Sequence, residues 1–133
     1  MSEPAPVMGA YSTTDDVRRL VEQYCREQRS ARLPLFTVLP SFRWQEACPR
    51  EAEGPGCYAI YGVNGWLLYV GMSVTNIANR IRKHGDPVVQ RCWFWTAHPP
   101  VTFDIIPVPE RWDAPSLEEF LTCKTARYNL KRE

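Results

Sequence analysis

The chain has 133 residues, of which 44% are hydrophobic and 23% charged, a composition typical of one globular domain that can bury a core. Its formal net charge of +1 neither requires nor excludes a polyanionic partner. The sequence shows no apolar run of the roughly 20 residues that a membrane span needs and no signal-peptide pattern at its N-terminus, so we expect no membrane association and a cytoplasmic location.

Residues 1–53 are predicted to contain one helix followed by an extended segment. The first 12 residues are rich in proline, and we expect them to be loosely held. From Thr14 to about Arg29 the hydrophobic residues follow helical spacing, and Asp15 and Asp16 fall in the first turn, where the helix dipole favours acidic groups. Prolines at positions 34, 40, 49 and 55 then predict an irregular segment that wraps around the core rather than forming it.

The stretch GCYAIYGVNGWLLYVG, residues 56–71, predicts two strands of a β-hairpin. Asn64-Gly65 is the strongest signal for a two-residue type I′ turn, because both positions of that turn need a positive φ. Such a turn pairs Tyr58 with Gly71. Because side chains alternate along a strand, one face of the hairpin would carry Tyr58, Ile60, Gly62, Leu67, Tyr69 and Gly71, and the better core face Ala59, Tyr61, Val63, Trp66, Leu68 and Val70.

Two tyrosines and a glycine meet on the first of these faces. Tyr58 and Tyr69 would be diagonal neighbours, so that their hydroxyl groups can converge. Gly71, opposite Tyr58, would leave a hollow in which a ligand can approach the backbone. Tyrosines are also common in strands for packing reasons alone, and that alternative stays open at this point.

A helix is predicted to follow the hairpin, with Ser73 or Thr75 as its N-cap and Gly85 as its C-terminal cap. Arg80 and His84, four residues apart, would lie on or beside the face that this helix turns to the sheet. Either residue also has an ordinary explanation, because an arginine can extend its charge into water and a cation suits a helix C-terminus.

The chain continues with a short helix near residues 88–92, a strand at 101–108 and a final helix that begins near Ser116. Ser116 and Glu119 have the spacing of a capping box. Glu118 would then lie on the rim of the buried stripe of this helix, close enough to lean over the tyrosine face.

The fold class predicted from these elements is α/β of the α+β type. Residues 54–133 are expected to form the order strand, strand, helix, short helix, strand and helix, with the helix and extended segment of residues 1–53 packed on this core.

Two segments are locally basic although the chain as a whole is nearly neutral. Arg80, Arg82, Lys83 and Arg91 lie between residues 71 and 91, and Lys124, Arg127, Lys131 and Arg132 lie between residues 120 and 132. Such segments can bind a polyanion or form solvated helix faces. We expect Arg82 and Lys83 to contact substrate if the partner is a nucleic acid.

Gly-Cys-Tyr at residues 56–58 and Tyr-Val-Gly at residues 69–71, followed by Arg80, His84, Glu118 and Asn129, resemble the motifs of the GIY-YIG nuclease family. The resemblance covers roughly Gly54 to Asn129. It implies an endonuclease that hydrolyses phosphodiester bonds in nucleic acid, most often DNA, with one divalent metal ion, Mg²⁺ or Mn²⁺. It also implies a small three-stranded antiparallel sheet flanked by helices. For the site it implies Tyr58 as general base for the attacking water, Tyr69 to hold the water or the phosphate, Arg80 on the scissile phosphate, His84 to support that group or the base, Glu118 on the metal, and Asn129 as a substrate contact.

The chemistry of these residue types is consistent with that implication. Arginine offers a bidentate fork to phosphate, and a carboxylate offers the hard oxygen that Mg²⁺ prefers. A phenol with its ordinary pKa of about 10 can act as a base only if Arg80 and the metal stabilise the phenolate.

Two other functions stay open. The chain could be a binding module of the same fold that recognises nucleic acid or protein without cleaving it. A cysteine nucleophile, Cys57 or Cys92 with His84 or His98, is the second alternative. Five cysteines without a C-x-x-C pair predict neither a disulfide framework nor a zinc site.

Overall fold

The structure is a computed structural model that describes residues 11–29 and 33–125. It is a mixed α+β fold built on a four-stranded antiparallel sheet with the order β1-β4-β2-β3. The strands are β1 (Phe42–Arg43), β2 (Gly56–Tyr61), β3 (Leu67–Ser73) and β4 (Thr102–Pro107). The helices are α1 (Thr14–Gln28), the 3₁₀ helix η1 (Arg50–Glu53), α2 (Ile77–His84), α3 (Pro87–Gln90), α4 (Trp93–Ala97) and α5 (Asp113–Lys124). No helix in this part of the chain is long and apolar enough to cross a membrane.

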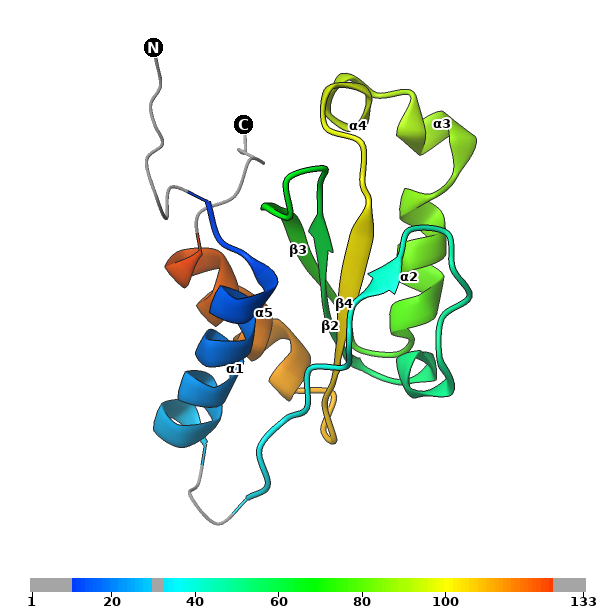
Figure 1. The fold of residues 1–133 in the computed structure, drawn as a ribbon. Helices are drawn as coiled ribbons and strands as arrows, with labels where there is room; N and C mark the ends of the chain where they lie inside the picture. The colour runs from blue at the N-terminus through cyan, green and yellow to red at the C-terminus, as the bar shows by residue number, and fades with distance from the viewer. Residues whose placement is uncertain (1–10, 30–32, 126–133) are drawn as a thin grey trace.

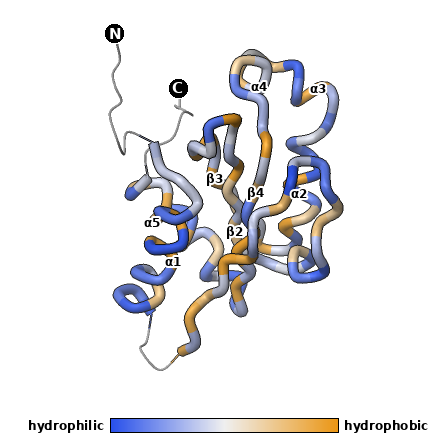
Figure 2. Tube along the Cα trace, in the orientation of Figure 1, coloured by the Kyte–Doolittle hydropathy of each residue, from blue (hydrophilic) through white to orange (hydrophobic). Residues whose placement is uncertain are grey.

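Helices cover both faces of the sheet, with α1 and α5 on one face and α2 on the other (Figure 1). The first face packs Val17, Val21, Leu117 and Leu121 against Cys57, Ala59 and Tyr61. The second packs Ile77 and Ile81 against Tyr58, Ile60 and Phe103. Every residue of β2 is therefore buried, so both faces of this strand belong to the core and neither is the better core face. Hydrophobic residues are accordingly concentrated in the strands, whereas α1 is hydrophilic along much of its length (Figure 2).

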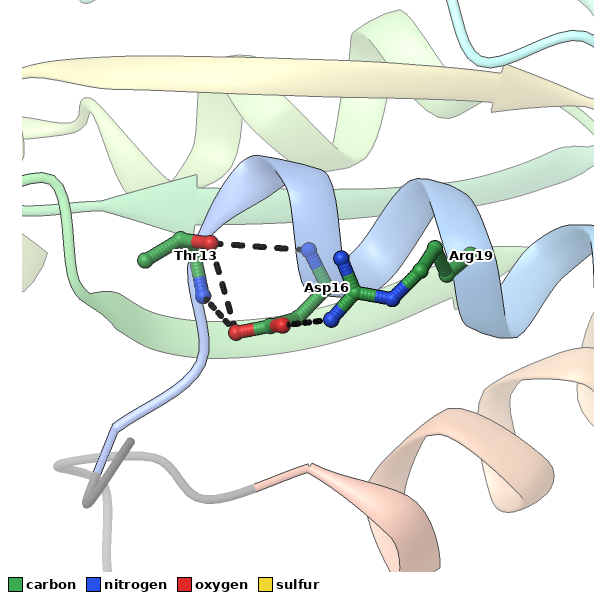
Figure 3. Close-up of polar contacts among 3 residues, drawn as sticks. All are labelled: Thr13, Asp16 and Arg19. Atoms are coloured by element: carbon green, nitrogen blue, oxygen red, sulfur yellow. Dashed lines mark hydrogen bonds and ion pairs between the residues drawn. The ribbon is translucent and has the colours of Figure 1, made fainter. Parts of the chain in front are cut away.

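Helix α1 begins at a complete capping box (Figure 3). The Thr13 backbone N–H donates to Asp16 Oδ2 over 2.9 Å, and the Asp16 backbone N–H donates to Thr13 Oγ1 over 3.5 Å. Asp16 also accepts from Arg19. These bonds satisfy N–H and carboxylate groups that would otherwise be unpaired at the helix start, which confirms the predicted helix and its acidic first turn.

The segment before β2 contributes to the core, contrary to expectation. Residues Phe42–Arg43 pair with β4 and add the fourth strand to the sheet. Phe36 belongs to the hydrophobic cluster under α1 and α5, and Ala52 belongs to the cluster under α2. The four prolines excluded long regular structure in this segment, but they did not exclude two residues of strand pairing at a sheet edge.

A buried carboxylate ties the N-terminal elements to the sheet. Asp104, in the middle of β4, is fully buried and accepts hydrogen bonds from the hydroxyl groups of Thr14, Ser41 and Tyr61 over 2.6, 2.5 and 2.8 Å. Such a group costs stability when it lacks partners, so each of the three hydroxyl donors contributes to the fold.

The hairpin has the predicted pairing near the tyrosines but a different turn. Gly62 and Trp66 close a three-residue loop in which Gly65 has a φ of 77°, so the two-residue type I′ turn is wrong. A bulge between Ile60 and Tyr61 then restores the predicted register, and Tyr58 pairs with Gly71. Between the loop and the bulge the faces are exchanged, so Leu67 packs with the α1 and α5 cluster and Leu68 with the α2 cluster.

Two predicted helix starts also need correction. The N-cap of α2 is Asn76, whose side chain accepts from the Asn79 backbone N–H; Ser73 instead accepts from the N–H groups of Thr75 and Asn76. Helix α5 begins at Asp113, so Ser116 lies inside it and accepts from the Tyr24 hydroxyl over 2.7 Å. The capping box between Ser116 and Glu119 is therefore wrong, because Pro115 is tolerated within the first turn and the helix begins before it.

Candidate active site

The hydroxyl group of Tyr58 lies 2.9 Å from Nε2 of His84, which joins β2 to the last residue of α2. The space for this phenol comes from Gly71 on β3. A Cβ atom at Gly71 would lie 2.4 Å from the Tyr58 hydroxyl oxygen and 2.9 Å from a ring carbon of Tyr69, far inside van der Waals contact. The hollow predicted opposite Tyr58 is therefore filled by the two tyrosine rings themselves.

Aromatic rings enclose the His84 imidazole. The ring centroid of His84 lies 4.7 Å from that of Tyr69, 5.6 Å from that of Tyr58 and 5.7 Å from that of Trp95, each in an edge-to-face arrangement. Trp95 comes from α4 and is only 6% exposed. His84 is thus held by contacts from β2, β3 and α4 in addition to its own helix.

Arg80 and Glu118 meet at the edge of the sheet that β3 forms. A cleft of about 360 Å³ lies there, and its lining includes Tyr69, Gly71, Arg80, Lys83 and Glu118. Glu118 comes from α5, which covers the opposite face of the sheet from α2, so the cleft brings together side chains from both helical layers around β3. The prediction that Glu118 leans toward the tyrosines while Glu119 does not agrees with this geometry, because Glu119 is exposed and does not line the cleft.

A larger hollow of about 630 Å³ runs along α1, away from these residues. Its lining includes Asp16, Arg19, Glu22 and Arg26, which are paired with one another as Arg19 with Asp16 and Arg26 with Glu22. Because these charges already neutralise each other, the cleft beside β3 is the better candidate for a functional site.

Burial, followed by the positive charge of Arg80, lowers the pKa of His84 to about 4. The imidazole is therefore neutral near pH 7, and Nε2 can accept a hydrogen bond from the Tyr58 hydroxyl when the proton resides on Nδ1. A neutral His84 can therefore accept the hydrogen bond of the phenol, but a pKa of about 4 makes the imidazole a weak base.

The pKa of Tyr58 is shifted in the direction opposite to the one that a base requires. Burial raises it most, Tyr69 and Glu118 raise it further, and only the nearby Arg80 lowers it. Tyr58 is fully buried. The expectation that Arg80 favours the phenolate is correct in direction, but its effect is smaller than the effect of burial.

The donor set at the cleft fits a divalent cation that is held mainly by substrate. Among the residues described, Glu118 is the one carboxylate that lines the cleft, and no group of three or more His, Cys, Asp and Glu side chains could hold a metal. Mg²⁺ usually keeps several waters and binds through one or two carboxylates together with substrate phosphates. One half-buried glutamate is sufficient for Mg²⁺ binding of this kind, but it is insufficient for a metal site made of protein ligands alone.

The remaining predicted substrate contacts do not all lie at the cleft. Lys83 lines the cleft with Arg80. Arg82 lies on another side of α2, where it donates to Asn79 Oδ1 over 2.5 Å and lines a separate cavity with Trp44 and Cys48. Asn129 falls outside the described residues.

Trp95 was not among the residues that sequence reasoning selected. The only signal was the cluster of aromatic residues in WFW, residues 93–95, which a core explains equally well. Contact between Trp95 and His84 depends on how α4 folds back over the sheet, and no local pattern encodes that arrangement.

The structure gives no support to a cysteine nucleophile at Cys57. This thiol faces α5, where it contacts the Ala114 carbonyl oxygen, on the side of β2 opposite Tyr58 and His84. Burial, and then the charge of Glu118, raises the pKa of Cys57 well above its ordinary value. Cys92 is exposed. A neutral, enclosed thiol is a poor nucleophile.

No family model, no curated protein and no solved structure matches the chain. The resemblance to GIY-YIG nucleases therefore stays a prediction that depends on the motif residues themselves.

Proposed function

We propose that this chain is a metal-dependent endonuclease of the GIY-YIG type that hydrolyses phosphodiester bonds in nucleic acid, with DNA as the expected substrate. The observation that carries the proposal is the 2.9 Å contact between the Tyr58 hydroxyl and Nε2 of a neutral His84, directly behind a cleft that holds Arg80 and Glu118. Proton acceptor, phosphate-binding cation and carboxylate thus converge on one edge of the sheet.

In the proposed reaction Arg80 binds the non-bridging oxygens of the scissile phosphate, which places positive charge where negative charge develops. The nucleophile is a water molecule held by Tyr69. Tyr58 acts as the phenolate: its own proton has left to solvent, the charge of Arg80 stabilises the phenolate, and its oxygen takes a proton from the attacking water. The water oxygen forms a bond to phosphorus, and the bond to the leaving oxygen breaks.

A high pKa makes Tyr58 a strong base once it is deprotonated, and the positive charge of Arg80 favours that form. The hydrogen bond between Tyr58 and His84 holds the phenol oxygen in place. A divalent cation held by Glu118 would supply Lewis-acid stabilisation of the charge on the leaving oxygen.

Incubation of supercoiled plasmid with the purified protein, with Mg²⁺ or with EDTA, tests the function. We expect nicking with Mg²⁺ and none with EDTA, and Arg80→Ala should fold but fail to cut because the phosphate loses its bidentate partner. Intact DNA that migrates more slowly in a gel would favour the binding module instead. Metal-independent cleavage, or wild-type cleavage by a folded Arg80→Ala protein, would contradict the proposed chemistry.

A further inference from the structure

One side of His84 is covered by Trp95, with Trp44 behind it, and neither tryptophan belongs to the motifs that resemble the nuclease family. The Trp95 ring packs against His84 at 5.7 Å and against Tyr69 at 6.2 Å between centroids. The Trp44 ring stacks on Trp95 at 6.5 Å with an interplanar angle of 21°. Trp44 follows β1, so the N-terminal segment outside the resemblance reaches the candidate site through this pair.

Neither indole is free to move independently of the sheet. Trp44 also packs edge-to-face on Phe103 of β4 at 6.0 Å, and Phe94 packs edge-to-face on Trp95 at 5.0 Å. Helix α4 is held by hydrogen bonds from Thr96 N–H to Cys92 O and from His98 N–H to Phe94 O. Together with its contacts to Tyr69 and Trp44, they hold the Trp95 ring beside His84.

We propose that Trp95, backed by Trp44, is a positioning residue that excludes water from His84 and keeps its Nε2 directed at the Tyr58 hydroxyl as a neutral hydrogen-bond acceptor. We call the space bounded by Tyr58, Tyr69 and Trp95 around His84 the aromatic compartment. The proposal rests on the proposed function for its catalytic meaning, but its physical content concerns His84 alone and can be measured without substrate.

The groups that surround His84 in the aromatic compartment determine its pKa. Tyr58 faces the imidazole from β2, Tyr69 from β3 and Arg80 from α2, while Trp95 faces it from α4 and does not titrate. Because burial is the largest cause of the low pKa, removal of the indole should admit water and raise the pKa of His84 from about 4 toward 6.5. Arg80 would still oppose protonation, so the pKa should stay somewhat below the ordinary value.

The experiment is an NMR pH titration of the imidazole Cε1–H signals in wild type, Trp95→Ala and Trp95→Phe. The chain has two histidines, so His84→Gln assigns the signals. Trp95→Ala should raise the pKa of His84, whereas Trp95→Phe, which keeps an aromatic cover, should leave it close to wild type. Trp112→Ala is the matched control, because this tryptophan is 66% exposed and stacks with Arg111 before α5.

The same variants should differ in the pH dependence of nicking. A raised pKa keeps His84 protonated to higher pH, where it cannot accept the hydrogen bond that positions Tyr58, so the acid limb of the Trp95→Ala rate profile should move to higher pH. Trp112→Ala should not move it.

A folded Trp95→Ala protein whose His84 titrates as in wild type would overturn the proposal. If Trp95→Ala does not fold, the pKa of His84 can be measured in Trp44→Ala, which loses only the half-buried ring behind Trp95. An unchanged pKa of His84 in Trp44→Ala would also overturn the proposal. Absence of nicking by the wild-type protein would instead count against the proposed function, and it would leave the titration result intact.

Discussion

A single glycine makes room for the phenol at the edge of the sheet. Gly71 pairs with Tyr58, and the space that its side chain would occupy is taken by the hydroxyl group and ring of Tyr58 and by the ring of Tyr69. No small displacement relieves such an overlap, because Tyr58 is packed on all sides within the cluster under α2. Gly71 thus belongs to the candidate site although it carries no functional group.

Gly71→Ala should lower the nicking rate strongly and destabilise the fold by about 1 to 3 kcal/mol, because the new methyl group must displace Tyr58 from His84. Gly54→Ala is the matched control, since a Cβ atom there meets nothing within 4 Å. Rates and thermal melts of both variants check the prediction. A Gly71→Ala protein with wild-type rate and stability would show that Tyr58 does not need its observed position.

At the scale of single elements, the basic residues of α2 lie on two different surfaces of the helix. Arg80 and Lys83, three residues apart, share the face that lines the cleft. Arg82 follows Arg80 by two residues, about 200° around the helix, and lines the cavity beside Trp44 instead. The sequence showed a basic segment, but only the placement of α2 on the sheet assigns its members to different surfaces.

Lys83→Ala should therefore reduce the slope of log affinity for DNA against log salt concentration by about one, because one phosphate contact is lost. Arg82→Ala should leave that slope unchanged. Fluorescence anisotropy with a labelled duplex at several salt concentrations measures both slopes. Equal effects of the two substitutions would mean that DNA does not follow the cleft.

Helix α5 gives the second comparison within one element. Glu118 is half-buried and lines the cleft, whereas Glu119 is exposed and has no capping role because the helix begins at Asp113. We expect Glu118→Gln to abolish Mg²⁺-dependent nicking with little change in melting temperature, since it removes the carboxylate that the metal requires. Glu119→Gln should keep both rate and melting temperature. Nicking by a folded Glu118→Gln protein would contradict the assignment of the metal ligand.

Most helices and strands could be predicted from the sequence, and the errors in these predictions have local causes. Helix α1 and strand β4 were confirmed, because hydrophobic spacing specifies them, and the pairing of Tyr58 with Gly71 was also confirmed. The turn was wrong, since Asn64-Gly65 fits a three-residue loop with Gly65 at positive φ as well as a type I′ turn. The bulge at Ile60 and Tyr61 compensated for that error, so the pairing near the site was unaffected.

At the scale of the whole molecule, the parts that could not be predicted depend on contacts between distant segments. The pairing of β1 with β4, the three donors to Asp104 and the stacking of Trp44 on Trp95 each join residues more than 40 positions apart. No local periodicity encodes such contacts. The raised pKa of Tyr58 has the same origin, because it follows from helices on both faces of the sheet.

Burial of His84 also makes a prediction for the stability of the whole fold. Its pKa is lowered to about 4 in the folded chain from 6.5, so the unfolded chain takes up a proton first as pH falls. The contribution of neutral His84 is present above about pH 6.5 and is lost as pH falls toward 4, by up to roughly 3 kcal/mol. Urea unfolding of wild type and His84→Gln across this range measures it. Parallel curves for the two proteins would contradict the burial of a neutral imidazole.

The central claim is that Tyr58 takes the proton from the attacking water, and rates of plasmid nicking by Tyr58→Phe and Tyr61→Phe test it most directly. Both variants lose one hydroxyl group, but Tyr58 contacts His84, whereas Tyr61 lies on the opposite face and donates to Asp104. We expect Tyr58→Phe to lose Mg²⁺-dependent nicking by a factor on the order of 10² to 10⁴. Tyr61→Phe should keep the rate and melt at a lower temperature. A folded Tyr58→Phe protein that nicks at the wild-type rate would contradict the claim.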